Sequence, residues 1–109
     1  QPNVWAALNL GHVRCLGQDP VKVADALGDR LRYVQLNACR ISLGGAPLDE
    51  HLPFQQDLEH AKALFGHLVS SGFSGVVCLD SSWTESPLSG LRAGLAEVRT
   101  LYPTCAQPQ

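Results

Sequence analysis

The stretch DPVKVADALGDRLRYVQLN, residues 19–37, decides the fold class because it predicts a helix that leads directly into a strand. Asp19 can accept hydrogen bonds from the free N–H groups of a first helical turn, and Pro20 is tolerated at the first helical position. Gly28 readily adopts the left-handed conformation that ends many helices. Residues 31–37 then predict a strand.

The same two kinds of element recur on both sides of this stretch. Residues 4–10, VWAALNL, form the near-continuous apolar run of a strand covered on both faces. Apolar spacings of three and four predict a helix over about 53–71, with a buried stripe of Leu58, Ala61, Phe65, Leu68 and Gly72. Residues 76–80, VVCLD, predict a third strand. A last helix over 87–102 would bury a stripe of Leu88, Leu91, Leu95, Val98 and Tyr102. Strands that alternate with helices predict an α/β fold with parallel strands.

Composition limits the classes of function. The chain has 109 residues, of which 45% are hydrophobic and 17% charged, so we expect one packed domain with a frayed tail over 104–109. A formal net charge of −2 argues against a dedicated binder of nucleic acid or membrane surfaces. No apolar run approaches the ~20 residues of a membrane span, and the first residues lack the order of a signal peptide.

The cysteines bear on the compartment. Cys15, Cys39, Cys78 and Cys105 contain no C-x-x-C pair, which argues against a zinc ribbon or a thioredoxin-type site. Four is an even number, which would allow two disulfides in a secreted domain. However, Cys78 lies inside an apolar run, where a small buried thiol is the ordinary interpretation. We therefore expect reduced thiols in a cytoplasmic protein.

Two further features concern the region between the second and third predicted strands. Residues 38–52 are predicted to form a long loop, and long loops in α/β units are often functional. In the helix that follows, His60 and His67 are seven residues apart and lie off the apolar stripe. We interpret them as solvated surface histidines.

Polar residues gather where the predicted strands end, which is where parallel sheets place their chemistry. They are Asn9, His12, Gln35, Asn37, Arg40 and Asp80, joined by Asp49, Glu50 and His51 from the long loop. Carboxylate and amide oxygens suit Mg²⁺ or Mn²⁺, and imidazole suits Zn²⁺ or Mn²⁺. Each residue also has a structural alternative: Asn37 could hydrogen-bond the next loop, His12 could be a turn residue, and residues 49–51 could be a solvated loop tip. The residues alone predict a metal site or a polar-substrate site.

Several of these stretches, in this order, resemble the xylose isomerase-like TIM-barrel superfamily. They are NLGH (9–12), GQDP (17–20), LGDRLRYVQLN (27–37), DEHLP (49–53) and GFSG (72–75). That superfamily includes sugar isomerases and epimerases and the endonuclease-IV type of AP endonuclease. The resemblance covers about residues 3–102 and implies three consecutive βα units of a (β/α)8 barrel, so that residues 1–109 would be the C-terminal portion of a partial barrel.

The resemblance also implies a set of metal ligands. Asn9 stands where the family has an Asp ligand, Gln35 where it usually has a His, and Asp80 where it typically has a Glu. The implied ion is Mn²⁺, Mg²⁺ or Co²⁺. Asp49 and His51 match a pair that holds an additional zinc in the endonuclease branch.

Other residues receive roles in catalysis and substrate binding from the same resemblance. Asp80 and His12 would be catalytic, with Asp80 as an acid–base carboxylate and His12 as a hydrogen-bond donor to a sugar oxygen. His12, Asn37 and Arg40 would contact the substrate.

The leading hypothesis is thus a metal-dependent isomerase or epimerase of a sugar or sugar phosphate, which moves a proton next to a carbonyl. The first alternative is a catalytically degenerate barrel domain used for binding or assembly, because Asn9, Gln35 and Ala38 all depart from the family pattern. The second is a zinc endonuclease, against which eight basic and ten acidic residues argue.

The expected partners follow from the sheet and from the charge. A three-stranded parallel sheet has two open edges, so we expect the rest of the barrel or a homo-oligomeric copy to cover them. A small sugar would be the substrate, with no membrane partner and no expected nucleic acid.

Overall fold

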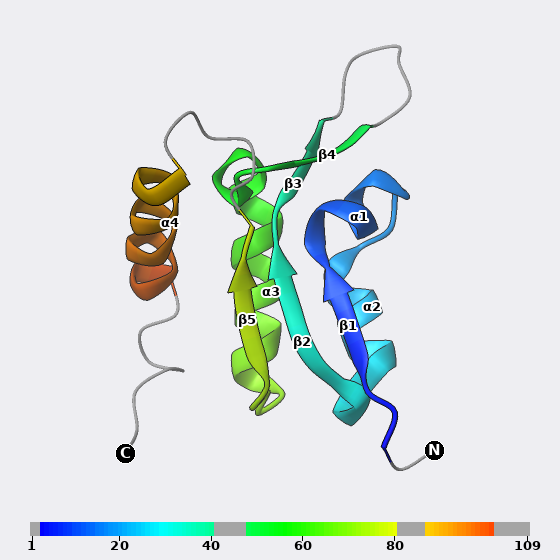
Figure 1. Ribbon diagram of the computed structural model, residues 1–109. Helices are drawn as coiled ribbons and strands as arrows, with labels where there is room; N and C mark the ends of the chain where they lie inside the picture. Colours follow the sequence, from blue (N-terminus) through cyan, green and yellow to red (C-terminus); the bar gives the residue numbers. More distant parts are fainter. Residues whose placement is uncertain (1–2, 41–47, 81–86, 102–109) are drawn as a thin grey trace.

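The sheet at the centre of the molecule is parallel, as predicted. The computed structural model describes residues 3–40, 48–80 and 87–101. Three strands lie in the order β1-β2-β5 (Figure 1). They are β1 (Ala6–Asn9), β2 (Leu31–Leu36) and β5 (Val76–Leu79). The α/β class is confirmed.

Helices α2 (Pro20–Leu27) and α3 (Leu58–Ser70) lie side by side behind the sheet (Figure 1). The predicted ends of α2 are confirmed: the Asp19 carboxylate accepts from the N–H of Val21 at 2.9 Å, and Gly28 has a φ of 54°. A short 3-10 turn, η1 (Gly28–Arg30), joins α2 to β2. No helix in the described ranges is both long enough and apolar enough to cross a membrane.

The two faces of the sheet differ in what covers them. On one face, Leu8, Val34 and Leu36 are buried against the helices. On the opposite face, no helix of the described chain covers the strands (Figure 1). We call this the open face; the strand register gives it Ala7, Asn9, Tyr33, Gln35, Val76 and Cys78. Val76 is 59% exposed and Cys78 is half-buried, so the expectation of a buried Cys78 thiol is wrong.

The first strand is shorter than predicted. The chain leaves β1 at Asn9 and enters helix α1 (Leu10–Cys15), which the sequence analysis did not anticipate. The Asn9 side chain caps this helix by accepting a hydrogen bond from the His12 N–H at 2.9 Å. Leu10, which the apolar pattern assigned to the strand, is buried with Val13 on the core side of α1.

The predicted long loop at 38–52 is wrong in its described part. Residues Ala38–Arg40 form β3 and Leu48–Leu52 form β4, and the two strands pair antiparallel. We call this pair the β3–β4 ribbon. It stands above the carboxyl end of β2 in Figure 1.

The helix predicted over 53–71 has two parts. A 3-10 turn, η2 (Phe54–Asp57), precedes α3. The predicted stripe of α3 is confirmed in part: Ala61, Phe65 and Leu68 are at most 2% exposed, whereas Leu58 is half-buried and Gly72 lies beyond the helix and is exposed. Leu64, which was not predicted to belong to the stripe, is fully buried as well. Phe54 packs against Phe65 with ring centroids 6.4 Å apart.

Helix α4 (Pro87–Leu101) begins where predicted, but its stripe is not buried. Leu88, Leu91 and Leu95 are 60%, 37% and 45% exposed. The reason is position: α4 lies beside β5 at the edge of the sheet rather than over a face (Figure 1). The predictions for Ser86, Tyr102 and the tail lie outside the described residues.

Candidate functional site

Three of the predicted site residues lie together where the parallel strands end. Asn9 ends β1 and pairs in register with Gln35 of β2. The Gln35 amide Nε2 donates a hydrogen bond to Asp80 Oδ2 at 2.9 Å. The backbone N–H of Asp80 donates to the carbonyl of Leu36 at 3.1 Å, which holds Asp80 against β2 after β5 ends. We call Asn9, Gln35 and Asp80 the carboxyl rim.

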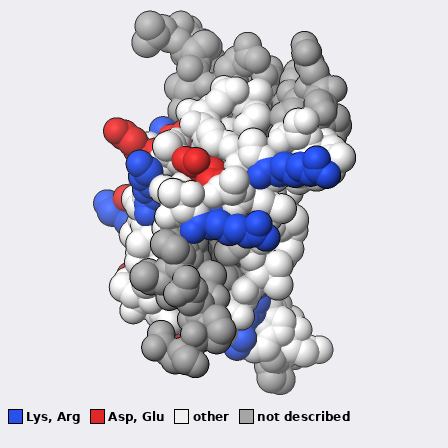
Figure 2. Space-filling model, turned by 90° about the vertical axis from the view of Figure 1, so that its left-hand side faces the viewer, with Lys and Arg blue, Asp and Glu red and all other residues white. Residues whose placement is uncertain are grey.

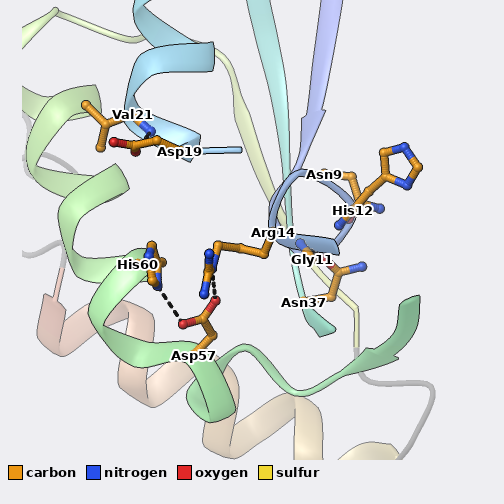
Figure 3. Close-up of polar contacts among 9 residues, drawn as sticks. All are labelled: Asn9, Gly11, His12, Arg14, Asp19, Val21, Asn37, Asp57 and His60. Carbon is orange, nitrogen blue, oxygen red and sulfur yellow. Dashed lines mark hydrogen bonds and ion pairs between the residues drawn. The ribbon is translucent and has the colours of Figure 1, made fainter. Parts of the chain in front are cut away.

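His12 lies next to the carboxyl rim because the cap of α1 places it there. Its backbone N–H binds the Asn9 side chain, and its ring is exposed. Figure 3 shows the ring pointing away from Arg14 and Asp57, on the side where Asn9 lies. The ring is therefore accessible to a ligand at the rim.

Asn37 serves the position of α1. It is fully buried, and its Oδ1 accepts a hydrogen bond from the Gly11 N–H at 2.7 Å (Figure 3). A Cβ on Gly11 would lie 2.7 Å from that oxygen and 3.1 Å from the Ala38 carbonyl carbon. The close approach requires glycine, and it fixes the helix that carries His12.

Sequence reasoning missed Tyr33 as a neighbour of the rim. The pKa of Tyr33 is raised above its ordinary value, first by its hydrogen bond with Cys78, then by burial, with the charges of Cys78 and Asp80 adding to the effect. Tyr33 and Cys78 are diagonal neighbours on the open face. The period-two alternation of residues 31–37 could have placed Tyr33 and Gln35 on one face.

A second polar cluster lies on the other side of α1. Arg14 Nε and Asp57 Oδ2 are 2.9 Å apart, and His60 Nδ1 and Asp57 Oδ1 are 2.8 Å apart (Figure 3). We call these three residues the Asp57 cluster. His60, interpreted from the sequence as a solvated surface histidine, is 36% exposed and also pairs with Asp57. Arg14 and Asp57 are 43 residues apart, so no local spacing could have revealed the pair.

The remaining predicted site residues come from the β3–β4 ribbon. Arg40 ends β3, and Asp49 and His51 belong to β4; their side chains, like that of Glu50, lie outside the described part of the structure. Among the side chains that are described, no three His, Cys, Asp or Glu residues gather in a way that could hold a metal ion.

The hollow beside Asp80 is too small to hold a sugar. Beside Asp80, a cavity lined also by Phe54 and Leu79 has a volume of about 10 Å³. A cavity of about 210 Å³ lies at the opposite end of the sheet, near Gly28 and His67. Small-molecule sites usually measure ~300–1,000 Å³. A ligand at the carboxyl rim would therefore be open on at least one side.

Charge on the α4 side of the molecule is mixed. Figure 2 shows basic and acidic side chains interspersed there among uncharged surface. A concentrated basic stripe, the usual footprint of a nucleic-acid groove, is not present on this face of the described residues. No known protein family, curated protein or solved structure matches the chain.

Proposed function

We propose that this chain contributes the carboxyl rim of a sugar or sugar-phosphate isomerase or epimerase, built on three βα units of a xylose isomerase-like TIM barrel. The observation that carries the proposal is the Gln35–Asp80 pair beside Asn9, at the ends of three adjacent parallel strands. In parallel sheets this is the end at which substrates bind.

The open face supports the barrel part of the proposal. In a TIM barrel one face of the sheet is covered by helices and the other faces the packed interior. Here the helix-covered face is buried, whereas the open face exposes Val76 and leaves Tyr33 37% exposed. The missing cover would come from the rest of a barrel or from a second copy of the chain.

The donor atoms of the rim suit a hard divalent cation. Mg²⁺ and Mn²⁺ prefer oxygen ligands and often bind one or two carboxylates, with waters completing the shell. Asp80 and the amide oxygen of Gln35 would hold the ion, whereas the Asn9 oxygen already accepts the His12 N–H and would contribute less. A bound Mn²⁺, Mg²⁺ or Co²⁺ would polarise the sugar carbonyl.

The residues of the chain supply the proton transfer. The Asp80 carboxylate would accept a proton from the carbon next to the carbonyl and return it to the neighbouring carbon or oxygen. The Gln35 N–H orients this carboxylate by binding one of its oxygens. The exposed His12 ring would donate a hydrogen bond to a sugar oxygen, and Asn37 keeps that ring in place by holding α1.

Proton exchange provides the test. Intact protein loaded with Mn²⁺ would be incubated in D₂O with a panel of aldoses, ketoses and their phosphates, and NMR would follow deuterium entry next to the carbonyl. We expect exchange with at least one sugar, reduced by at least about 100-fold in Asp80→Asn. Asp25→Asn, an exposed acid on α2, is the matched control and should keep full exchange. Absence of exchange in the wild-type protein with every sugar would rule the proposal out.

One observation favours a second candidate, a domain that binds a sugar without catalysis. Both rim amides already bond protein groups: Asn9 caps α1, and Gln35 donates to Asp80. The two amides are neutral, so the carboxyl rim has little negative charge to attract a cation. A neutral polar ligand would suit it better. A sugar that raises the Tm in the presence of EDTA, with no deuterium exchange, would favour this candidate.

A further inference from the structure

The close packing of α1 on the end of β2 brings two cysteines together. Gly11 contacts Asn37 and the backbone of Ala38. Cys15 lies four residues after Gly11, on the same side of α1, and Cys39 lies two residues after Asn37 along β3. Four helical residues rise about 6 Å and two strand residues about 6.6 Å, so Cys15 and Cys39 lie at similar distances along their elements from the contact between Gly11 and Asn37.

The electrostatics of the two side chains agree with this geometry. Both cysteines are free and half-buried, and Cys15 lies near enough to Cys39 to raise the pKa of its thiol. They come from different elements, since Cys15 is the last residue of α1 and Cys39 the middle residue of β3. A bond between them would therefore join the helix that carries His12 to the β3–β4 ribbon.

We propose that Cys15 and Cys39 are a redox-active pair that closes into a reversible disulfide and ties α1 to the β3–β4 ribbon. The bond encloses the chain between residues 15 and 39, which contains α2 and β2. Closing a loop of this length restricts the unfolded chain and so stabilises the folded state. It also fixes the base of the ribbon on which Arg40, Asp49 and His51 lie. The pair itself does not depend on the proposed sugar chemistry.

A small-molecule disulfide is the oxidant, and the reaction is thiol–disulfide exchange. The Cys15 thiolate attacks one sulfur of the small disulfide, forms a mixed disulfide and releases one small thiolate. Cys39 then loses its proton and attacks the Cys15 sulfur, which forms the protein disulfide and releases the second small thiolate. The protons of the two protein thiols end on the two released thiols, so two electrons pass from the protein to the small disulfide.

The surroundings decide which thiol attacks first. Burial raises the pKa of the Cys39 thiol, and the neighbouring Cys15 raises it further. The charge of Arg14 acts in the opposite direction and that of Asp57 in the same direction, so the Asp57 cluster lies within electrostatic reach of the pair. A raised pKa leaves less Cys39 thiolate at neutral pH, which favours Cys39 as the resolving thiol.

The experiment uses the whole chain and oxidised glutathione as the probe. The reduced protein is incubated with a range of glutathione ratios, quenched with acid and weighed by mass spectrometry. We expect the loss of two hydrogen atoms with no glutathione attached. After tryptic digestion under non-reducing conditions, the peptide 15–22 should be linked to the peptide 33–40. The oxidised protein should have a Tm more than about 5 °C above that of the reduced protein.

Three single variants separate the outcomes. Cys39→Ser should accumulate a stable glutathione adduct on Cys15, whereas Cys15→Ser should react slowly and form no internal disulfide. Cys78→Ser, the control, should still close the 15–39 bond. The proposal is overturned if the wild-type protein keeps its glutathione adduct, does not react, or links Cys78 or Cys105 instead.

Discussion

Helices α3 and α4 have the same kind of apolar stripe and opposite surroundings. In α3, Leu64 is 0% exposed and Phe65 2%, because the helix lies over the sheet. In α4, Leu91 is 37% exposed and Leu95 45%, because the helix lies beside the edge strand β5 (Figure 1). Between α4 and β5 there is a groove of about 340 Å³ lined by apolar side chains.

The difference shows what a helical pattern specifies. Spacings of three and four determine which residues share one side of a helix, but not whether another element lies against that side. An apolar stripe at the edge of a sheet stabilises little until something fills the groove. The stability of the described chain should therefore depend on α3 far more than on α4.

The largest expected effect comes from truncating one leucine in each helix. Leu64→Ala removes a fully buried side chain of the core and should lower the free energy of unfolding by about 3 kcal/mol. Leu91→Ala makes the same chemical change on α4 and should cost less than about 1 kcal/mol, because solvent already reaches the side chain. Urea unfolding followed by circular dichroism measures both.

The Leu64→Ala and Leu91→Ala variants also test whether a second copy of the protein covers α4 in solution. If the protein forms oligomers that fill the groove, Leu91→Ala should weaken them, and its cost should rise with protein concentration. Equal losses for the two variants at low concentration would contradict the difference in burial.

The sequence was sufficient for the parts of the fold that local patterns determine. The cap at Asp19, the stop at Gly28 and three residues of the α3 stripe (Ala61, Phe65 and Leu68) were predicted correctly, because each depends on residues within a few positions of one another. The helix α1 was missed, because the predicted apolar run extends across Asn9 to Leu10, the first residue of the helix, and only the Asn9 cap marks the change.

The candidate site also combines contacts that the sequence predicts with contacts that it does not. Asn9, Gln35 and Asp80 were expected to meet because parallel strands end at one edge, and the Gln35–Asp80 bond joins two of them. The Asp57 cluster and the Cys15–Cys39 contact join residues far apart in the chain across α1. No periodicity encodes such contacts; they follow from where Gly11 allows α1 to sit.

An intermediate effect should follow from removing the polar anchor at the start of α3. The Asp57 carboxylate is 19% exposed and pairs with both Arg14 and His60. Asp57→Ala should lower the free energy of unfolding by about 1–2 kcal/mol, because it leaves a partly buried guanidinium without its hydrogen-bond partner.

Glu59→Ala is the matched control for this anchor. Glu59 is an exposed acid in the first turn of the same helix, so its removal should change stability by less than about 0.5 kcal/mol. A loss as large as that of Asp57→Ala would mean that charge near the start of α3, rather than the specific pairing, stabilises the helix.

The smallest and most discriminating effect concerns one glycine in each helix. A Cβ on Gly66 of α3 would meet nothing within 4 Å, whereas one on Gly94 of α4 would lie 3.1 Å from the Leu79 Cδ1 of β5. Alanine in a helix is favoured over glycine by about 0.5–1 kcal/mol, so Gly66→Ala should stabilise the protein by that amount. Gly94→Ala gains the same propensity but must displace Leu79, and its net stabilisation in urea titrations should be smaller. Equal gains for both variants would mean that α4 does not rest on β5 at Gly94.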